Sequence, residues 1–73
     1  MEHGAIKIKL DGLLKSKGMS KRKLCRMAEM NWSQVNNYCK GSITRFDADV
    51  LARICAALDC DISDLLEYVP PKE

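Results

Sequence analysis

Four side chains in segment 32–40 are of types that can recognise the edges of DNA bases. On a helix with about 100° per residue, they fall together on one side; they are Trp32, Ser33, Asn36 and Asn37. Asparagine can pair with N6 and N7 of adenine, and serine can reach several base edges. Asparagine and serine are mediocre helix formers, so helix stability does not explain their presence. We therefore expect these four residues to contact bases, with a plain solvated face as the alternative.

Trp32 differs from the other three because its side chain is large and mostly apolar. At the first position of the predicted helix the indole is expected to be exposed. It could pack on a thymine methyl group or on a sugar, because both are apolar surfaces of DNA. The alternative is that the ring folds back on the protein.

Five positive residues, at the end of this segment or beside it, are candidates for binding phosphate. Lys21, Arg22 and Lys23 occupy the first turn of a predicted helix, where the helix dipole disfavours cations by about 0.3–1 kcal/mol each. A local rule broken without structural gain usually indicates function. Their side chains, with the N–H groups of that turn, are predicted to clamp a DNA phosphate. Lys40 and Arg45 are predicted to hold the next phosphates, and a solubilising cluster is the alternative.

The charge of the chain is divided between its two parts. Residues 1–45 carry ten Lys/Arg and three Asp/Glu, a balance of +7, whereas residues 46–73 carry two and seven, a balance of −5. The two values add to the net charge of +2. One small domain divided in this way is expected to have a basic side that attracts polyanions.

The four cysteines do not form a recognisable metal or disulfide pattern. They lie at spacings of 14, 16 and 5 residues, and the single histidine, His3, is close to the N-terminus; the cysteines are Cys25, Cys39, Cys55 and Cys60. Zinc sites require closer ligand spacing. We expect reduced cysteines that pack as small apolar residues, with a redox sensor as the open alternative.

Other classes of function find little support in the sequence. No nucleophile–base pair, Gly-rich phosphate loop or carboxylate dyad is visible, so we expect no enzyme, no cofactor, no metal and no small-molecule ligand. Asp59, Asp61 and Asp64 lack the spacing of a calcium-binding loop and are interpreted as helix caps. No apolar run approaches the ~20 residues of a membrane span, and the N-terminus does not resemble a signal peptide. We therefore expect a cytoplasmic protein.

Apolar periodicity and capping residues predict five helices. The first helix is expected at 10–17, the third at 32–40 and the fifth at 61–66. The second is expected to begin after its cap Ser20, and the fourth to run from its cap Asp47 to Leu58. Hydrophobic staples fit the second, third and fourth helices, formed by Met19 with Leu24, Met30 with Val35 and Phe46 with Leu51. Asn31 with Gln34 fits a capping box. The second helix is expected to bury Leu24, Cys25, Met27 and Ala28. Segment 6–9 alternates and could form a strand paired with 68–69.

The second and third predicted helices are joined by the short turn 28–31, which is the layout of a helix-turn-helix. Apolar or small residues recur through this unit at Leu24, Cys25, Ala28, Met30, Val35, Tyr38 and Gly41. With its flanking helices the chain resembles the Cro and lambda-repressor-like family, over about residues 8–69. The tail Leu65-Leu66-Glu67-Tyr68 is similar to that of small stand-alone bacterial or phage members.

The resemblance implies that positions 32, 33, 36 and 37 read bases and that the start of the second helix contacts the DNA backbone. Two positions depart from the family pattern. Cys25 stands where a smaller residue is usual, and Glu29 stands where glycine is usual. Glu29 is therefore expected to adopt a positive φ, which is uncommon for residues other than glycine.

These observations predict an all-α, five-helix lambda-repressor-like DNA-binding domain, with a short terminal strand pair left open. The single domain would span 1–73, with a helix-turn-helix core at 20–41, an N-terminal arm at 1–8 and a C-terminal tail at 67–73. We expect a transcriptional regulator, most simply a repressor, that reads double-stranded DNA with helix 32–40. We also expect a homodimer formed through the fourth and fifth helices and the terminal segments. The alternative function is a protein-interaction module, such as an antitoxin or adaptor.

Overall fold

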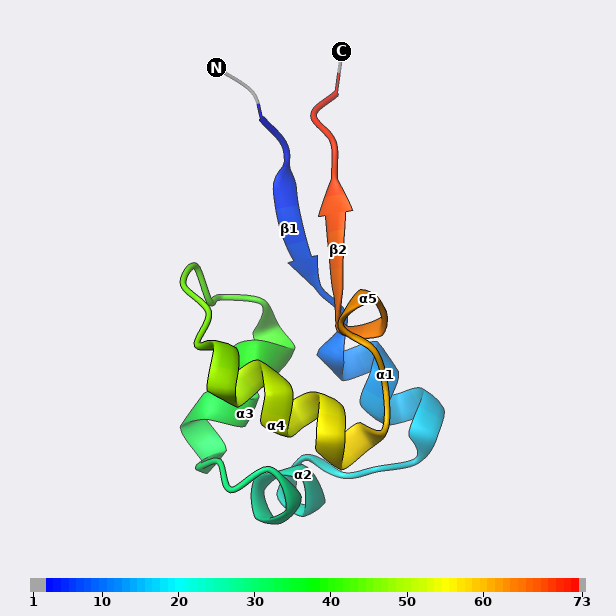
Figure 1. The fold of residues 1–73 in the computed structure, drawn as a ribbon, viewed down its shortest axis with the longest axis vertical. Coiled ribbons are helices and arrows are strands. Elements are labelled where there is room, and N and C mark those ends of the chain that lie inside the picture. The colour runs from blue at the N-terminus through cyan, green and yellow to red at the C-terminus, as the bar shows by residue number, and fades with distance from the viewer. Residues whose placement is uncertain (1–2, 73) are drawn as a thin grey trace.

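Residues 3–72, which the computed structural model describes, form five short helices and one pair of strands (Figure 1). In chain order the elements are β1 (Ala5–Ile8), α1 (Leu10–Lys17), α2 (Lys21–Met27), α3 (Trp32–Lys40), α4 (Ala48–Leu58), α5 (Ile62–Leu65) and β2 (Leu66–Val69). The predicted five-helix architecture is confirmed.

The terminal strand pair, which the sequence left open, is present, but its bounds differ from those expected. Strands β1 and β2 are antiparallel, with Ala5 opposite Val69 and Ile8 opposite Leu66. The fifth helix ends at Leu65, one residue earlier than predicted, because Leu66 already has extended backbone angles. The N–H of Lys9 donates to the Leu65 carbonyl at 2.7 Å, and this bond fixes the point where both strands meet the helices.

The strand pair projects from one end of the helical body and makes the molecule elongated, with extents of 41 × 22 × 18 Å (Figure 1). Near its outer end the Tyr68 hydroxyl donates to the carbonyl oxygen of His3 at 3.0 Å. Gly4 has a φ of 81°, and a Cβ at that position would collide with the Val69 carbonyl oxygen and the Tyr68 ring. The close approach of the N-terminal arm to β2 therefore depends on glycine.

The core lies between the helices and is entirely apolar. Its buried members come from every helix and from the turn between α2 and α3; they are Leu10, Leu14, Leu24, Ala28, Met30, Val35, Tyr38, Val50, Ile54, Leu58 and Leu65. All four cysteines are partly buried, and none forms a disulfide among these residues. This placement supports their interpretation as packing residues.

One core prediction is wrong. Met27 was expected to be buried, but 48% of its surface is exposed. The buried stripe of α2 runs through Leu24 and Ala28, which are four residues apart, whereas Met27 lies on the other side of Leu24. The inward face of this helix is therefore narrower than the sequence pattern indicated.

Candidate nucleic-acid interface

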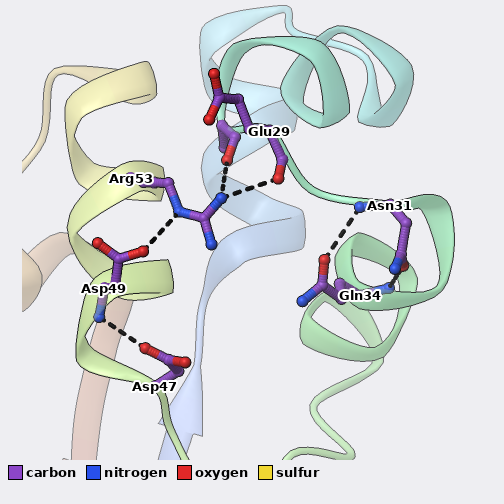
Figure 2. A network of polar contacts seen from close by, with 7 residues as sticks. Glu29, Asn31, Gln34, Asp47, Asp49 and Arg53 are labelled. Carbon is purple, nitrogen blue, oxygen red and sulfur yellow. Dashed lines mark hydrogen bonds and ion pairs between the residues drawn. The ribbon is translucent and has the colours of Figure 1, made fainter.

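Helix α3 is held at both ends by local bonds that fix its bounds at Trp32 and Lys40, and Figure 2 shows the bonds at its start. The Gln34 N–H donates to Asn31 Oδ1 at 2.8 Å, and the Asn31 N–H donates to Gln34 Oε1 at 3.1 Å, which completes the predicted capping box. Gly41 ends the helix with a φ of 75°. With one side anchored by buried Val35 and Tyr38, the opposite side must face outward.

The four predicted base-reading residues lie on this outward side of α3. Trp32 is half exposed, and Ser33 and Asn37 are also exposed. Asn36 is partly buried, and its Oδ1 accepts a hydrogen bond of 3.3 Å from Nζ of Lys21. The outer face of α3 therefore presents hydroxyl, amide and indole groups together, with one amide already tied to α2.

Two predicted phosphate-binding residues of α2 gather around the Trp32 ring. The guanidinium carbon of Arg22 lies 5.5 Å from the ring centroid, and Nζ of Lys21 lies 6.0 Å from it. Both distances are within the range of cation–π attraction. The structure thus joins the first turn of α2 to the start of α3 through Lys21, Arg22 and Trp32, an arrangement that the sequence did not predict.

The other predicted phosphate-binding residues are exposed and more widely spread. Lys23 is in the first turn of α2, Lys40 is the last residue of α3, and Arg45 is in the loop that follows it. Across residues 3–72 no ion pair involves any of these three cations. Their charges are therefore available to a negatively charged partner.

The turn between α2 and α3 has the strained conformation that the sequence predicted. Glu29 has a φ of 53°, in the left-handed region. Nη1 of Arg53, on helix α4, donates to the carbonyl oxygens of Ala28 and Glu29 at 3.2 and 2.9 Å (Figure 2). Nε of Arg53 lies 3.2 Å from Oδ2 of the exposed Asp49, an ion-pair contact. Arg53 thus positions α3 indirectly, by holding the turn that precedes it.

Arg53 was not among the site residues predicted from the sequence. The one visible signal was its spacing of four residues from Asp49, which is that of an ordinary surface ion pair on a helix. The hydrogen bonds of Arg53 to the turn join residues that are 24 or more positions apart in the chain, so local spacing did not indicate them.

Two titratable side chains of α3 have pKa values above their usual range. Burial raises the pKa of the thiol of Cys39, which belongs to α3, so this thiol stays protonated near neutral pH. Burial also raises the pKa of the Tyr38 hydroxyl on the inward side of α3. Within residues 3–72 no three His, Cys, Asp or Glu side chains are grouped closely enough to hold a metal ion.

None of the helices in residues 3–72 has both the length and the apolar character required to cross a membrane.

The fold, the capped helix pair and the polar outer side of α3 are those of a helix-turn-helix domain, and the chain belongs to the family of Cro/C1-type helix-turn-helix DNA-binding domains, whose sequence pattern matches residues 9–71. The resemblance seen in the sequence is thereby confirmed. A search of curated proteins found no significant match to this chain.

Two solved structures show the same fold. The transcriptional regulator VanUg is 26% identical, with a TM-score of 0.74 over 97% of this chain and 93% of that one. A candidate DNA-binding protein from Bacteroides fragilis is 16% identical, with a TM-score of 0.75 over 86% of this chain and 100% of that one. At that lower identity the likeness concerns the fold alone.

Proposed function

We propose that this protein is a sequence-specific transcriptional regulator that represses by occupying promoter DNA, with α3 in the major groove. The main support is that α3 is capped at both ends and buried on one side, so that its polar side is held outward as a rigid unit. A helix of about 10–12 Å in diameter fits the major groove, which is about 12 Å wide. Repression is the simplest consequence of an occupied promoter.

Within this proposal Ser33, Asn36 and Asn37 read base edges. Asn37 is exposed, and its backbone carbonyl accepts a hydrogen bond from Ser42 Oγ. Among residues 3–72 its side-chain amide makes no hydrogen bond, so this amide can both donate to adenine and accept from it. Asn36 already accepts a bond from Lys21, but its amide N–H groups remain available to a base acceptor. Trp32 lies at the edge of the same face, at the start of the helix.

The phosphate contacts come from the cations on both sides of α3. Lys21, Arg22 and Lys23 precede it in α2, Lys40 is its last residue, and Arg45 lies in the loop that follows. Contacts to phosphates set the position and register of a protein on the duplex without reading its sequence. If four of these side chains each neutralise one phosphate, the slope of log K against log salt is about −3 to −4 per subunit.

We further propose that two copies bind a two-fold DNA site. A single domain of this kind covers about 600–1,000 Å² on DNA and reads too few base pairs to select one site in a genome. A contact between copies through the terminal strands and α5 is supported by exposed apolar side chains there; they are Ile6, Ile62, Tyr68 and Val69. Helix α4, which the sequence also suggested for this contact, has no large exposed apolar residue to support it.

The rival function, a protein-interaction module, is favoured by one observation. Trp32 is a large apolar residue that is 50% exposed at the edge of the reading face. The surrounding amide, hydroxyl and cationic groups favour DNA, because protein interfaces are depleted of lysine and serine at their cores.

The test of the proposed function is selection of bound duplexes from a random pool, followed by affinity measurements over a range of salt concentrations. We expect a recurrent sequence and a salt slope of about −3 to −4 per subunit. If no duplex is bound at ~50 mM salt, where phosphate contacts are strong, the proposal is wrong.

A further inference from the structure

A shallow hollow of about 480 Å³ opens beside Trp32 at the side of helix α2. Three of its lining residues are cations, and the others are a hydroxyl, a thiol and the indole; the lining is Ser20, Arg22, Lys23, Cys25, Arg26 and Trp32. Of the cations, Arg26 was assigned no role by the sequence pattern. The hollow is thus positively charged with one aromatic wall.

The three cations of the hollow have no negative partner in the structure. Arg22, Lys23 and Arg26 are all exposed, and within residues 3–72 none of them is within ion-pair distance of a carboxylate. Helix α2, KRKLCRM, contains no acidic residue. Arg22 and Arg26 are four residues apart, so they lie on the same face of the helix. Such a concentration of unpaired charge favours an anionic occupant.

The Trp32 indole supplies an apolar wall that is already fixed in place. Arg22 lies over its ring at 5.5 Å, and half of the residue remains exposed. Because the ring is held in this way, binding of a partner costs little further conformational entropy of the Trp32 side chain. Cations beside an apolar surface match a ligand that is part anion and part uncharged ring.

The hollow lies beside the surface proposed to read bases. Trp32 belongs to both, and Lys21 ties the start of α2 to Asn36 on the reading face. When a helix fills the major groove, the structures that border it on either side are the sugar–phosphate strands. The side of α3 that continues into the hollow therefore meets a backbone strand rather than a base.

We propose that this hollow binds a sugar–phosphate segment of the DNA backbone, with Arg26 as an additional phosphate-binding residue. Arg22, Lys23 and Arg26 contact the phosphates, and Trp32 packs against the deoxyribose. This inference rests on the proposed function and deepens it: it adds Arg26 to the interface and places Trp32 on the backbone instead of on a base.

Arg26→Gln tests the new phosphate contact. We expect binding at ~50 mM salt to weaken about tenfold, equally on selected and random duplexes, and the salt slope to flatten by about 0.9, the contribution of one phosphate. Lys72→Gln removes an exposed cation from the C-terminal tail and is the matched control. If Arg26→Gln changes the affinity and the slope no more than Lys72→Gln does, the inference is wrong.

Trp32→Ala tests the role of the indole. If Trp32 packs against the deoxyribose, the affinity should fall by the same factor on selected and random duplexes. If Trp32 contacts a base, the affinity should fall only on the selected duplex. Circular dichroism of the variant checks that it folds, and Trp32→Phe, which retains a ring, should recover part of the affinity. Failure of the unmodified protein to bind any duplex would instead refute the proposed function, so the two failures are distinguishable.

Discussion

Arg53 on α4 donates a hydrogen bond of 2.9 Å to the backbone carbonyl of Glu29, the residue that turns the chain from α2 into α3. The same nitrogen bonds to the Ala28 carbonyl at 3.2 Å. One side chain thus satisfies two carbonyls at the end of α2, where helical partners are missing. The orientation of α3 therefore depends on a helix that does not itself belong to the helix-turn-helix.

Replacing Arg53 by methionine is expected to destabilise the protein by about 1–3 kcal/mol, because the carbonyls of the turn lose a charged donor. Urea denaturation measures the free energy of unfolding. Asp49→Asn is the matched control: it removes an exposed ion pair, worth about 0–1 kcal/mol, while leaving the donors of Arg53 in place. Equal losses in the two variants would show that the contact with the turn is unimportant.

Replacing Glu29 by glycine is expected to stabilise the protein by about 0.5–1 kcal/mol. The left-handed conformation costs a residue with a Cβ about 1–2 kcal/mol, and the greater freedom of glycine in the unfolded chain offsets part of this gain. Thermal or urea unfolding measures the change. Ala52→Gly, within helix α4, serves as the control and should destabilise by about 1 kcal/mol. A loss of stability in Glu29→Gly would contradict the strain assigned to this turn.

The stability of the protein is expected to fall between about pH 9 and 11 in a way that depends on Cys60. Burial, reinforced by the neighbouring Cys55 thiol, raises the pKa of Cys60 from 9.0 to about 11. In that interval the folded state keeps a proton that the unfolded state has lost, so the free energy of unfolding decreases as the pH rises. Urea unfolding at several pH values should show a smaller decrease for Cys60→Ser than for the unmodified protein. Cys25→Ser is the control, and identical pH profiles for Cys60→Ser and the unmodified protein would refute the assignment.

Two subunits are expected on each selected duplex, on inverted half-sites whose centres are about 34 Å apart. Opposite residues share one face of a strand pair, so Ile6 and Tyr68 lie side by side on the exposed part of the terminal strand pair. Ile6→Ser should weaken cooperative binding of the second subunit, and Met27→Ser, which changes a similarly exposed apolar residue on α2, should not. Native mass spectrometry gives the stoichiometry. One subunit on a site without an inverted repeat would rule out the dimer.

The parts of the fold that the sequence predicted correctly are those encoded by residues close together in the chain. Asn31 and Gln34 are three residues apart, and Gly41 directly follows the helix that they begin, so the bounds of α3 were readable. The positive φ of Glu29 followed from the short turn in the family pattern. Local capping and turn chemistry needs no knowledge of how the helices cross.

The contacts that the sequence did not reveal depend on how the helices pack. Lys21 meets Asn36 across 15 residues, and Arg53 meets Glu29 across 24. Arg22 reaches the Trp32 ring because α2 and α3 pack against each other at their beginnings. Residue types and spacing indicated what the surface could bind, whereas the pairing of its side chains required the three-dimensional structure.

The central claim, that the polar side of α3 reads bases, is tested most directly by measuring the affinity of Asn37→Ala for the selected duplex and for a random duplex at one salt concentration. The account predicts a loss of about 1–3 kcal/mol on the selected duplex and almost none on the random one, because one bidentate base contact is removed. Arg22→Gln, which removes a phosphate contact, should weaken both equally. If Asn37→Ala also weakens both duplexes equally, or changes neither, then α3 does not read the sequence in the way proposed.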